Sequence, residues 1–429
     1  MSWENWELIL NLFSGKVKNL KAILAWCFYD WANSAYSCVI TTFIFGTYFT
    51  EKIATNRIIG TAEWAHADAI AGLLIAIVSP VFGAVADYQG RRKPWILFFN
   101  IFAFISAMLL WFAMPSSQMV FYVLTCFIIG TFCLEVAFVF YNSMLSDIAP
   151  SAYLGRISGW AWGLGYLGGI ISLVIALLLV RNTFSWLPLN PATYENVRIT
   201  GPLVALWLAI FTPPLFIFVP DRKPTGLSFY QAIITGITSL WTLLIRMSEH
   251  KKIFLFLLAR MIYTDGLNTL FAFAGIYAAG TMGMSLTQVI ELGIVLNISA
   301  GIGAAIFAWV DDLKGSKYTV LLTLTLMIIF GICLVMTSNL QLFWFFAIGV
   351  SLSVGPVQAA SRTYMVRVSP PEIMTELFGL YALSGKATAF IGPWVLGWVT
   401  LQFNSQRAGV ASVFVFLALG GILLTQVKD

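Results

Sequence analysis

Long uncharged stretches, separated by short charged segments, dominate the chain. Pro94–Leu134 and Tyr318–Ser361 contain 41 and 44 residues without Asp, Glu, Lys or Arg. A helix needs about 20 mostly apolar residues to cross the hydrocarbon of a bilayer. These runs are too long, and alternate too little, for the strands of a membrane β-barrel. We therefore expect helices, which satisfy their own backbone groups in hydrocarbon.

The pattern predicts an all-α polytopic membrane protein with twelve spans. They cover residues 22–50, 66–86, 94–114, 118–142, 156–181, 203–220, 253–280, 287–310, 318–337, 341–366, 375–402 and 408–427. Between the sixth and seventh spans, Asp221–Lys252 carries one polar and one apolar helical face, which indicates an amphipathic helix on the membrane surface. The expected organisation is an N-terminal amphipathic segment (1–21), two six-helix bundles (22–220 and 253–429) and a linker (221–252).

Composition narrows the class of protein. Hydrophobic residues make up 59% of the chain and charged residues 10%, against about 45–50% and 25% in soluble domains. This excludes a soluble enzyme, a disordered chain and a nucleic-acid-binding module. The five cysteines lie in apolar runs without a CxxC pair, and there are only two histidines. We therefore expect neither a metal centre nor a cofactor.

The distribution of Lys and Arg predicts how the chain is oriented in the membrane. With the N-terminus inside, seventeen of the 24 basic residues fall on the inner side and five on the outer side. The other two, Arg260 and Lys386, fall within spans. The positive-inside rule then places both termini in the cytoplasm, and we expect the cell (inner) membrane. The first apolar run is a full span without a clear cleavage site, so no cleavable signal peptide is expected.

The two halves of the chain repeat each other. Three segments recur in the same order, at similar offsets: Asp30–Ser34 with Asp265–Thr269, Asp87–Arg92 with Asp312–Lys317, and Met144–Gly159 with Tyr364–Gly379. Such internal duplication is typical of secondary transporters, whose substrate site lies between the repeats near the membrane midplane.

Several of these segments resemble a known family. Gly83–Lys93 is similar to the loop motif of the major facilitator superfamily, with Tyr88 where a basic residue is usual. Tyr29–Tyr36, Tyr263–Thr269 and Gly355–Arg362 resemble the "unknown major facilitator" branch. Its eukaryotic relatives are autophagy-linked vacuolar effluxers of amino acids. The resemblance implies the major facilitator fold of two six-helix pseudo-repeats.

Ionisable groups deep in spans are costly and usually face a cavity or a partner. Five qualify: Asp30, Glu135, Arg260, Asp265 and Lys386. Asp30 and Asn33 share a helix face, as do Asp265 and Asn268, and each pair can bind a proton, a cation or a substrate amine. Alternatively, each Asp braces a broken helix. Asp265 can also belong to one network with Arg260. Trp31 lies beside Asp30, where a substrate could contact it.

The deep charges also suggest how transport is coupled. Three acids against two bases leave one carboxylate that can carry a proton. Glu135 has no charge nearby in sequence and is the first candidate, and Asp30 is the second. Lys386 can bind an anionic substrate group, although an ion pair with one of the acids is the alternative. Asp68 and His66 are expected to be solvated groups near outer helix ends.

The repeated loops are candidate gates, because their basic side chains can lock onto carboxylates and helix C-termini. The gating candidates are Asp87, Gly90, Arg91, Arg92, Asp312, Gly315 and Lys317. Arg362, at the end of the tenth span, is expected to be a gate or a structural brace.

Together these features predict a secondary active transporter that moves a small polar metabolite, an amino acid first, by alternating access with proton coupling. A sugar/cation symporter is the alternative. A polytopic membrane enzyme is less favoured, because it would need a nucleophile–base pair or clustered metal ligands. The expected partners are the substrate, a proton or cation and the lipid bilayer, without nucleic acid, and the chain is expected to act as a monomer.

Overall fold

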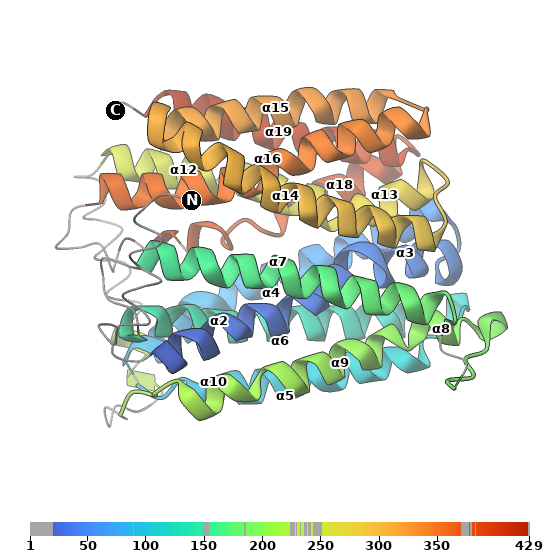
Figure 1. Ribbon diagram of the computed structural model, residues 1–429, viewed down its shortest axis with the longest axis horizontal. Coiled ribbons are helices and arrows are strands. Elements are labelled where there is room, and N and C mark those ends of the chain that lie inside the picture. Colours follow the sequence, from blue (N-terminus) through green and yellow to red (C-terminus); the bar gives the residue numbers. More distant parts are fainter. Residues whose placement is uncertain are drawn as a thin grey trace.

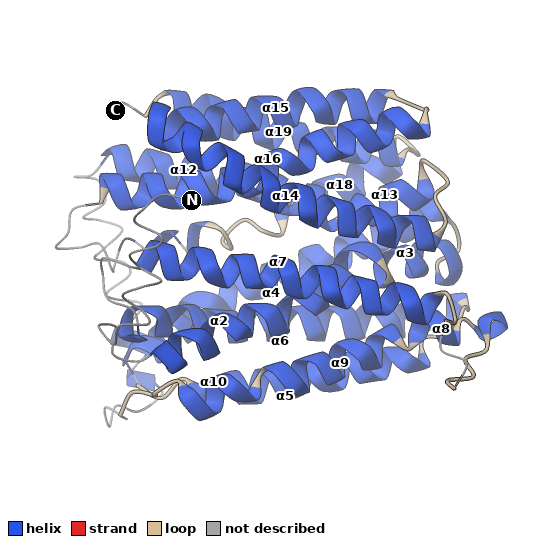
Figure 2. Ribbon diagram, viewed as in Figure 1, coloured by secondary structure: helices blue, strands red, loops and turns tan. Residues whose placement is uncertain are grey.

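The computed structural model describes the chain from Leu20 to Val427, with gaps. The gaps are 89, 149–153, 184–185, 224–227, 229, 232, 236–237, 239–241, 243–250, 370–376, 378–379 and 382. Helices are the regular structure found in this part of the chain (Figure 2). Most of the predicted linker helix and nearly all of the predicted N-terminal segment lie outside the described residues.

Among the described residues, ten helices are long and apolar enough to cross a membrane, which confirms an all-α polytopic protein. They are built from α4 (Arg57–Tyr88), α5 (Lys93–Leu109), α6 (Val120–Ile148), α7 (Leu154–Val180), α9 (Thr200–Phe211) with α10 (Pro213–Phe218), α12 (Lys251–Ala272), α14 (Leu286–Lys314), α15 (Ser316–Met336), α16 (Leu340–Val368) and α19 (Gln406–Thr425). The short helices α8 (Glu195–Arg198) and α13 (Ala274–Gly280) lie beside α9 and α12 in the sequence.

The first and eleventh predicted spans are interrupted helices. The first runs through α2 (Leu20–Ala35), the π-helix η1 (Tyr36–Phe43), α3 (Phe45–Tyr48) and a second π-helix, η2 (Phe49–Ile53). The eleventh is broken by turns over residues 385–390 and resumes as α18 (Ile391–Gln402). The prediction of one continuous helix over 375–402 is therefore wrong. Pro393 explains the break, because its ring clashes with the carbonyl four residues earlier and is tolerated only in a first turn.

The helices form two bundles that lie against each other (Figure 1). Helices α2–α10 form the first half and α12–α19 form the second. α7 packs against α14, and α4 packs against α18, across the boundary. α2 begins and α19 ends at the left-hand side of Figure 1. We call this side the terminal face and the other side the opposite face.

The repeated loops have matching backbone conformations in the two halves. Gly90 and Gly315 both have φ of 91°, a left-handed conformation that favours glycine. Gly90 follows α4 in the first half, and Gly315 follows α14, the corresponding helix of the second half. The two loops are thus structural as well as sequence repeats.

Candidate functional site

An ion pair joins the two halves in the middle of the protein. Glu135 lies in the centre of α6, and its carboxylate contacts the ammonium group of Lys386 from the interruption before α18. The side chains remain 32% and 31% exposed, so the pair is not sealed in the core. The sequence singled out both residues, and the fold brings them together. Glu135 has no charge nearby in sequence, but the other half of the chain supplies one.

Helix α12 holds the two ends of the interruption. The Arg260 guanidinium donates hydrogen bonds to the Tyr381 carbonyl (2.6 Å) and to Ser384 Oγ (2.7 Å). It also lies over the Tyr381 ring, 3.6 Å from the ring centroid. The positive charge of Arg260 therefore contacts a backbone carbonyl before the break. A cation is favourable there, because the C-terminal end of a helix carries a partial negative charge. The expected network between Arg260 and Asp265 is replaced by this contact with the segment before the break.

Asp265 holds the other end. Its Oδ2 accepts a hydrogen bond from the backbone N–H of Gly392 (3.0 Å), in the first turn of α18. A carboxylate is stabilised at the positive end of a helix dipole. Close packing requires the glycine, because a Cβ on Gly392 would lie 2.2 Å from Thr269 Oγ1 and 2.9 Å from Asp265 Oδ1. Asp265 thus braces a broken helix, as the alternative interpretation of the sequence expected.

The environments of Asp265 and its predicted companion differ. Asp265 is only 3% exposed, and its Oδ1 has no hydrogen-bond partner in the described part of the chain. Asn268, one turn later, is exposed. The two side chains therefore do not form one buried binding group in this conformation.

Asp30 lies at a second contact region between the halves. Its Oδ2 accepts a hydrogen bond from the Tyr141 hydroxyl of α6 (2.8 Å), and Asn33, one turn later, is partly buried. The Tyr141 ring is held by stacking on Trp26, with centroids 4.4 Å apart. Arg362 of α16 lies within electrostatic range of Asp30, and among the described residues it has neither a hydrogen bond nor an ion pair. An acid and a base from opposite halves thus face each other without direct contact.

Trp31 points into a packing cluster. Its ring stacks on Trp207 of α9, with centroids 5.7 Å apart and planes 9° apart, and contacts Phe211 edge-on. The Trp207 indole N–H also donates to the Trp31 carbonyl (3.0 Å). These contacts fix α2 against α9, and we leave Trp31 out of the proposed site.

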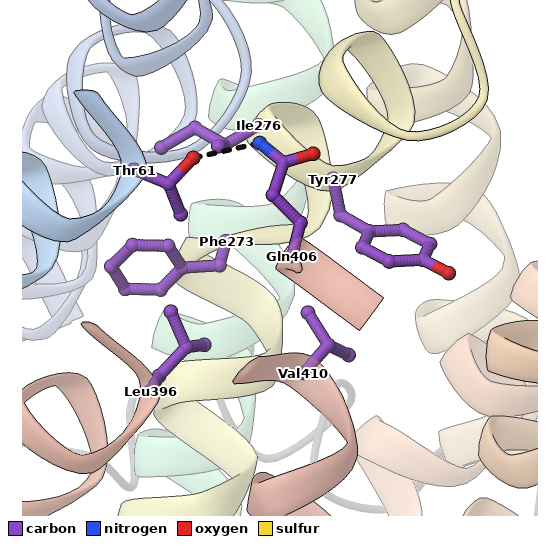
Figure 3. Close-up of a pocket in the computed structure, with 7 residues that line it drawn as sticks. All are labelled: Thr61, Phe273, Ile276, Tyr277, Leu396, Gln406 and Val410. Carbon is purple, nitrogen blue, oxygen red and sulfur yellow. Dashed lines mark hydrogen bonds between the residues drawn. The ribbon is translucent and has the colours of Figure 1, made fainter. Parts of the chain in front are cut away.

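A hydrogen bond and an ion pair join the halves at the opposite face. Gln406 donates to Thr61 Oγ1 of the first half (2.7 Å), and Thr281, from the same half as Gln406, donates to Gln406 (2.8 Å). Nearby, the Arg181 and Glu291 side chains form an ion pair. The Gln406–Thr61 bond crosses a hollow without room for a water molecule (Figure 3). The hollow is lined by Thr61, Phe273, Ile276, Tyr277, Leu396, Gln406 and Val410.

The predicted loop residues mainly brace each half from within. Arg92, only 1% exposed, pairs with Asp147 of α6, and Asp147 also pairs with Arg222. Lys317 donates to the Val427 carbonyl near the end of α19. Arg91 is exposed, and the Asp87 side chain lies outside the described residues.

In the second half, the carboxylate next to the predicted one carries the main contact. Arg367 contacts buried Asp311 at 3.2 Å, while Asp312 is 77% exposed and 3.9 Å away. Asp312 stays a predicted gating residue, and the structure adds Asp311, which lies closer to Arg367, as a further candidate. Two adjacent aspartates at the end of a helix point in different directions, and the packing of the helix decides which side chain faces the protein interior.

The expectation that Asp68 is a vestibule group near a helix end is wrong. α4 begins at Arg57 rather than at residue 66, so Asp68 lies about three turns inside the helix. It lies within electrostatic range of Glu135 and Lys386. The missed signal was the mostly apolar stretch Ile58–Ala65, which extends the helix toward the opposite face.

Comparison with known proteins agrees with this architecture. Residues 4–173 match the family described as Major Facilitator Superfamily. The structure is similar to that of a D-xylose-proton symporter, with a TM-score of 0.68, 14% identity and 96% of each chain covered. It is also similar to the human organic anion transporter MFSD10, with a TM-score of 0.66, 14% identity, and 94% of this chain and 99% of that chain covered. At these identities the likeness establishes the fold.

Sequence relatives point the same way. The chain is 27% identical over 418 residues to the uncharacterized MFS-type transporter YxiO of Bacillus subtilis, covering 94% of each protein. It is 25% identical over 302 residues to autophagy-related protein 22-1 of Aspergillus fumigatus, covering 64% of this chain and 48% of that protein. Thus the chain matches about half the length of that fungal relative.

Fold and relatives together define a transporter of the major facilitator superfamily and not an enzyme. Residues 146–429, more than half of the chain, match the family described as "Vacuole effluxer Atg22 like". The chain belongs to that family. This confirms the superfamily and the branch that the sequence motifs indicated.

Proposed function

We propose that the protein is a proton-coupled carrier of small amino acids that works by alternating access between its two halves. The observation that carries this proposal is the Glu135–Lys386 ion pair, which links the first half to the second in mid-membrane. Neutralising one partner of a partly buried ion pair removes the attraction and leaves the other charge uncompensated. Protonation of Glu135 would therefore loosen the contact and favour separation of the halves.

The second contact region suggests the substrate class. Asp30 offers a carboxylate, and Arg362 offers a guanidinium from the opposite half. These charges complement the ammonium and carboxylate groups of an amino acid. A bound zwitterion would bridge the two halves, and such a bridge favours the conformation in which the halves are close. The description of the family, vacuole effluxer, supports a role in transport.

The contacts at the opposite face support the conformation that the proposal needs. Thr61, Gln406 and Thr281 close that side. Access to Glu135 and Lys386 in this state would come from the terminal face, which the charge pattern predicts to be cytoplasmic. We therefore assign the conformation to an inward-facing step of the cycle.

Transport in proteoliposomes tests the proposal. Vesicles containing the full chain would receive a mixture of radiolabelled L-amino acids outside, with or without an imposed pH gradient. We expect accumulation that depends on the gradient and disappears when a protonophore collapses it. A parallel set with radiolabelled xylose and glucose tests the sugar/cation alternative. Accumulation of the sugars without the amino acids would reject the proposed substrate class.

A further inference from the structure

Asp68 lies on the face of α4 that packs against the interrupted eleventh helix. One turn before it, Ala65 and His66 meet Gly397 of α18, where an added Cβ would lie 3.0 and 3.1 Å from them. One turn after it, a Cβ on Gly72 would lie 3.0–3.1 Å from the backbone of Ala389 and Phe390. Residues three to four apart share a helix face. Asp68 is therefore positioned beside the segment that carries Lys386.

The groups around Asp68 are mostly acidic. Glu135 of α6 and Asp265 of α12 are the neighbouring carboxylates, and Lys386 is the cation that acts on Asp68. The Tyr36 hydroxyl of η1 also lies within electrostatic range, and His66 is on the same helix. Asp68 thus has two acidic neighbours, Glu135 and Asp265, and one basic neighbour, Lys386.

Two of these carboxylates have partners that stabilise the ionised form. Glu135 pairs with Lys386, and Asp265 accepts the Gly392 N–H at the start of a helix. Asp68 is partly buried and has neither a hydrogen bond nor an ion pair within the described part of the chain. An ionised carboxylate without a partner is costly in a membrane-embedded site, and binding a proton removes that cost.

We propose that Asp68 binds the coupling proton when Lys386 is held by Glu135, so that the two acids compete for one lysine. A proton adds to an Asp68 carboxylate oxygen in the paired state. When the Lys386 ammonium group turns toward Asp68, this proton passes to the Glu135 carboxylate that the lysine has left. This inference deepens the proposed function and rests on its proton coupling. It makes Asp68, beside Glu135, a second determinant of coupling.

Infrared difference spectroscopy of the full chain in phosphatidylcholine vesicles tests this without any substrate. A neutral carboxylic acid has a C=O stretch that an ionised carboxylate lacks. The difference between spectra in acidic and alkaline buffer should contain this band in the unaltered protein. Other carboxylates also become neutral in acid, so the Asp68 signal is the component of the band that Asp68→Asn removes. Glu63→Gln changes another partly buried carboxylate of the same helix and should retain this component.

Two further variants make the test specific for competition. Glu135→Gln frees Lys386 to pair with Asp68, so the band should also be lost. Lys386→Gln leaves both acids without a cation, so the band should grow. Asp68→Glu keeps a carboxyl group and should shift the band in frequency, which covers the case in which Asp68→Asn does not fold. A band that is unchanged in Asp68→Asn, or unshifted in Asp68→Glu, would overturn the proposal.

Transport separates this inference from the proposed function. With the labelled amino-acid mixture, Asp68→Asn should keep counterflow exchange and lose accumulation driven by the pH gradient, while Glu63→Gln keeps both. Gradient-driven accumulation by Asp68→Asn at the rate of the unaltered protein would reject the role of Asp68 alone. If the unaltered protein does not accumulate amino acids but the infrared band depends on Asp68, only the substrate assignment fails.

Discussion

The Asp265 carboxylate accepts the backbone N–H of Gly392 across a distance of 3.0 Å, and this bond fixes where the eleventh helix restarts. Arg260, on the same helix α12, binds the Tyr381 carbonyl before the break. One helix therefore holds both ends of the segment that presents Lys386 to Glu135. The position of the ion pair is set by residues that do not take part in it.

Removing the Asp265 carboxylate should loosen this arrangement. We expect Asp265→Ala to lower stability by about 1–2 kcal/mol, the usual cost of losing a helix N-cap, and to slow transport. Asp265→Asn keeps an oxygen acceptor and should recover most of the stability. Thermal unfolding of the purified variants measures this. Asn268→Ala, an exposed change on the same helix, is the control, and an equal loss in that variant would argue against the capping role.

Substitutions in the Glu135–Lys386 ion pair should separate proton coupling from substrate binding. Glu135→Gln imitates the protonated acid, so counterflow exchange should persist while accumulation driven by a pH gradient is lost. Lys386→Ala removes the cation that the sequence predicts to bind an anionic substrate group, and it should weaken substrate binding about tenfold or more, which corresponds to about 1.4 kcal/mol. Initial rates over a range of amino-acid concentrations distinguish the two effects. Accumulation by Glu135→Gln at the normal level would exclude Glu135 from coupling.

The loop after α14 offers a matched pair of substitutions. Asp311→Ala removes the closer, buried partner of Arg367, whereas Asp312→Ala removes an exposed carboxylate. Exposed ion pairs contribute little, about 0–1 kcal/mol. We therefore expect the first variant to slow transport several-fold and the second to have a small effect. Similar rates for both, or a larger effect of Asp312→Ala, would contradict this assignment.

Sidedness can be tested with single cysteines in a background where the five native cysteines are replaced. Ser228 belongs to the linker predicted to be cytoplasmic, and Thr193 belongs to the loop between α7 and α9. A membrane-impermeant maleimide added to intact cells should label position 193 and spare position 228 until the membrane is permeabilised. Labelling of both positions from the same side would reject the predicted topology.

The sequence by itself determined the architecture of this transporter. Hydrocarbon requires backbone groups to be paired within each segment, so uncharged runs such as Tyr318–Ser361 could only be helices around a turn. The repeated Asp–Gly loops also revealed the duplication, because Gly90 and Gly315 occupy the same left-handed conformation. Glu135 and Lys386 also stood out in the sequence. A charged side chain within a membrane span is energetically costly and usually has a function.

Tertiary structure decided which of these charges meet. Glu135 and Lys386 are 251 positions apart, and no local pattern encodes a contact that forms only when two bundles pack. Helix ends are also the least certain part of a sequence pattern: an earlier start of α4 moved Asp68 from a predicted vestibule to the ion-pair cluster. Pro393 accounts for the break in the eleventh helix, but the backbone groups freed there need partners, and Arg260 and Asp265 supply them from another helix.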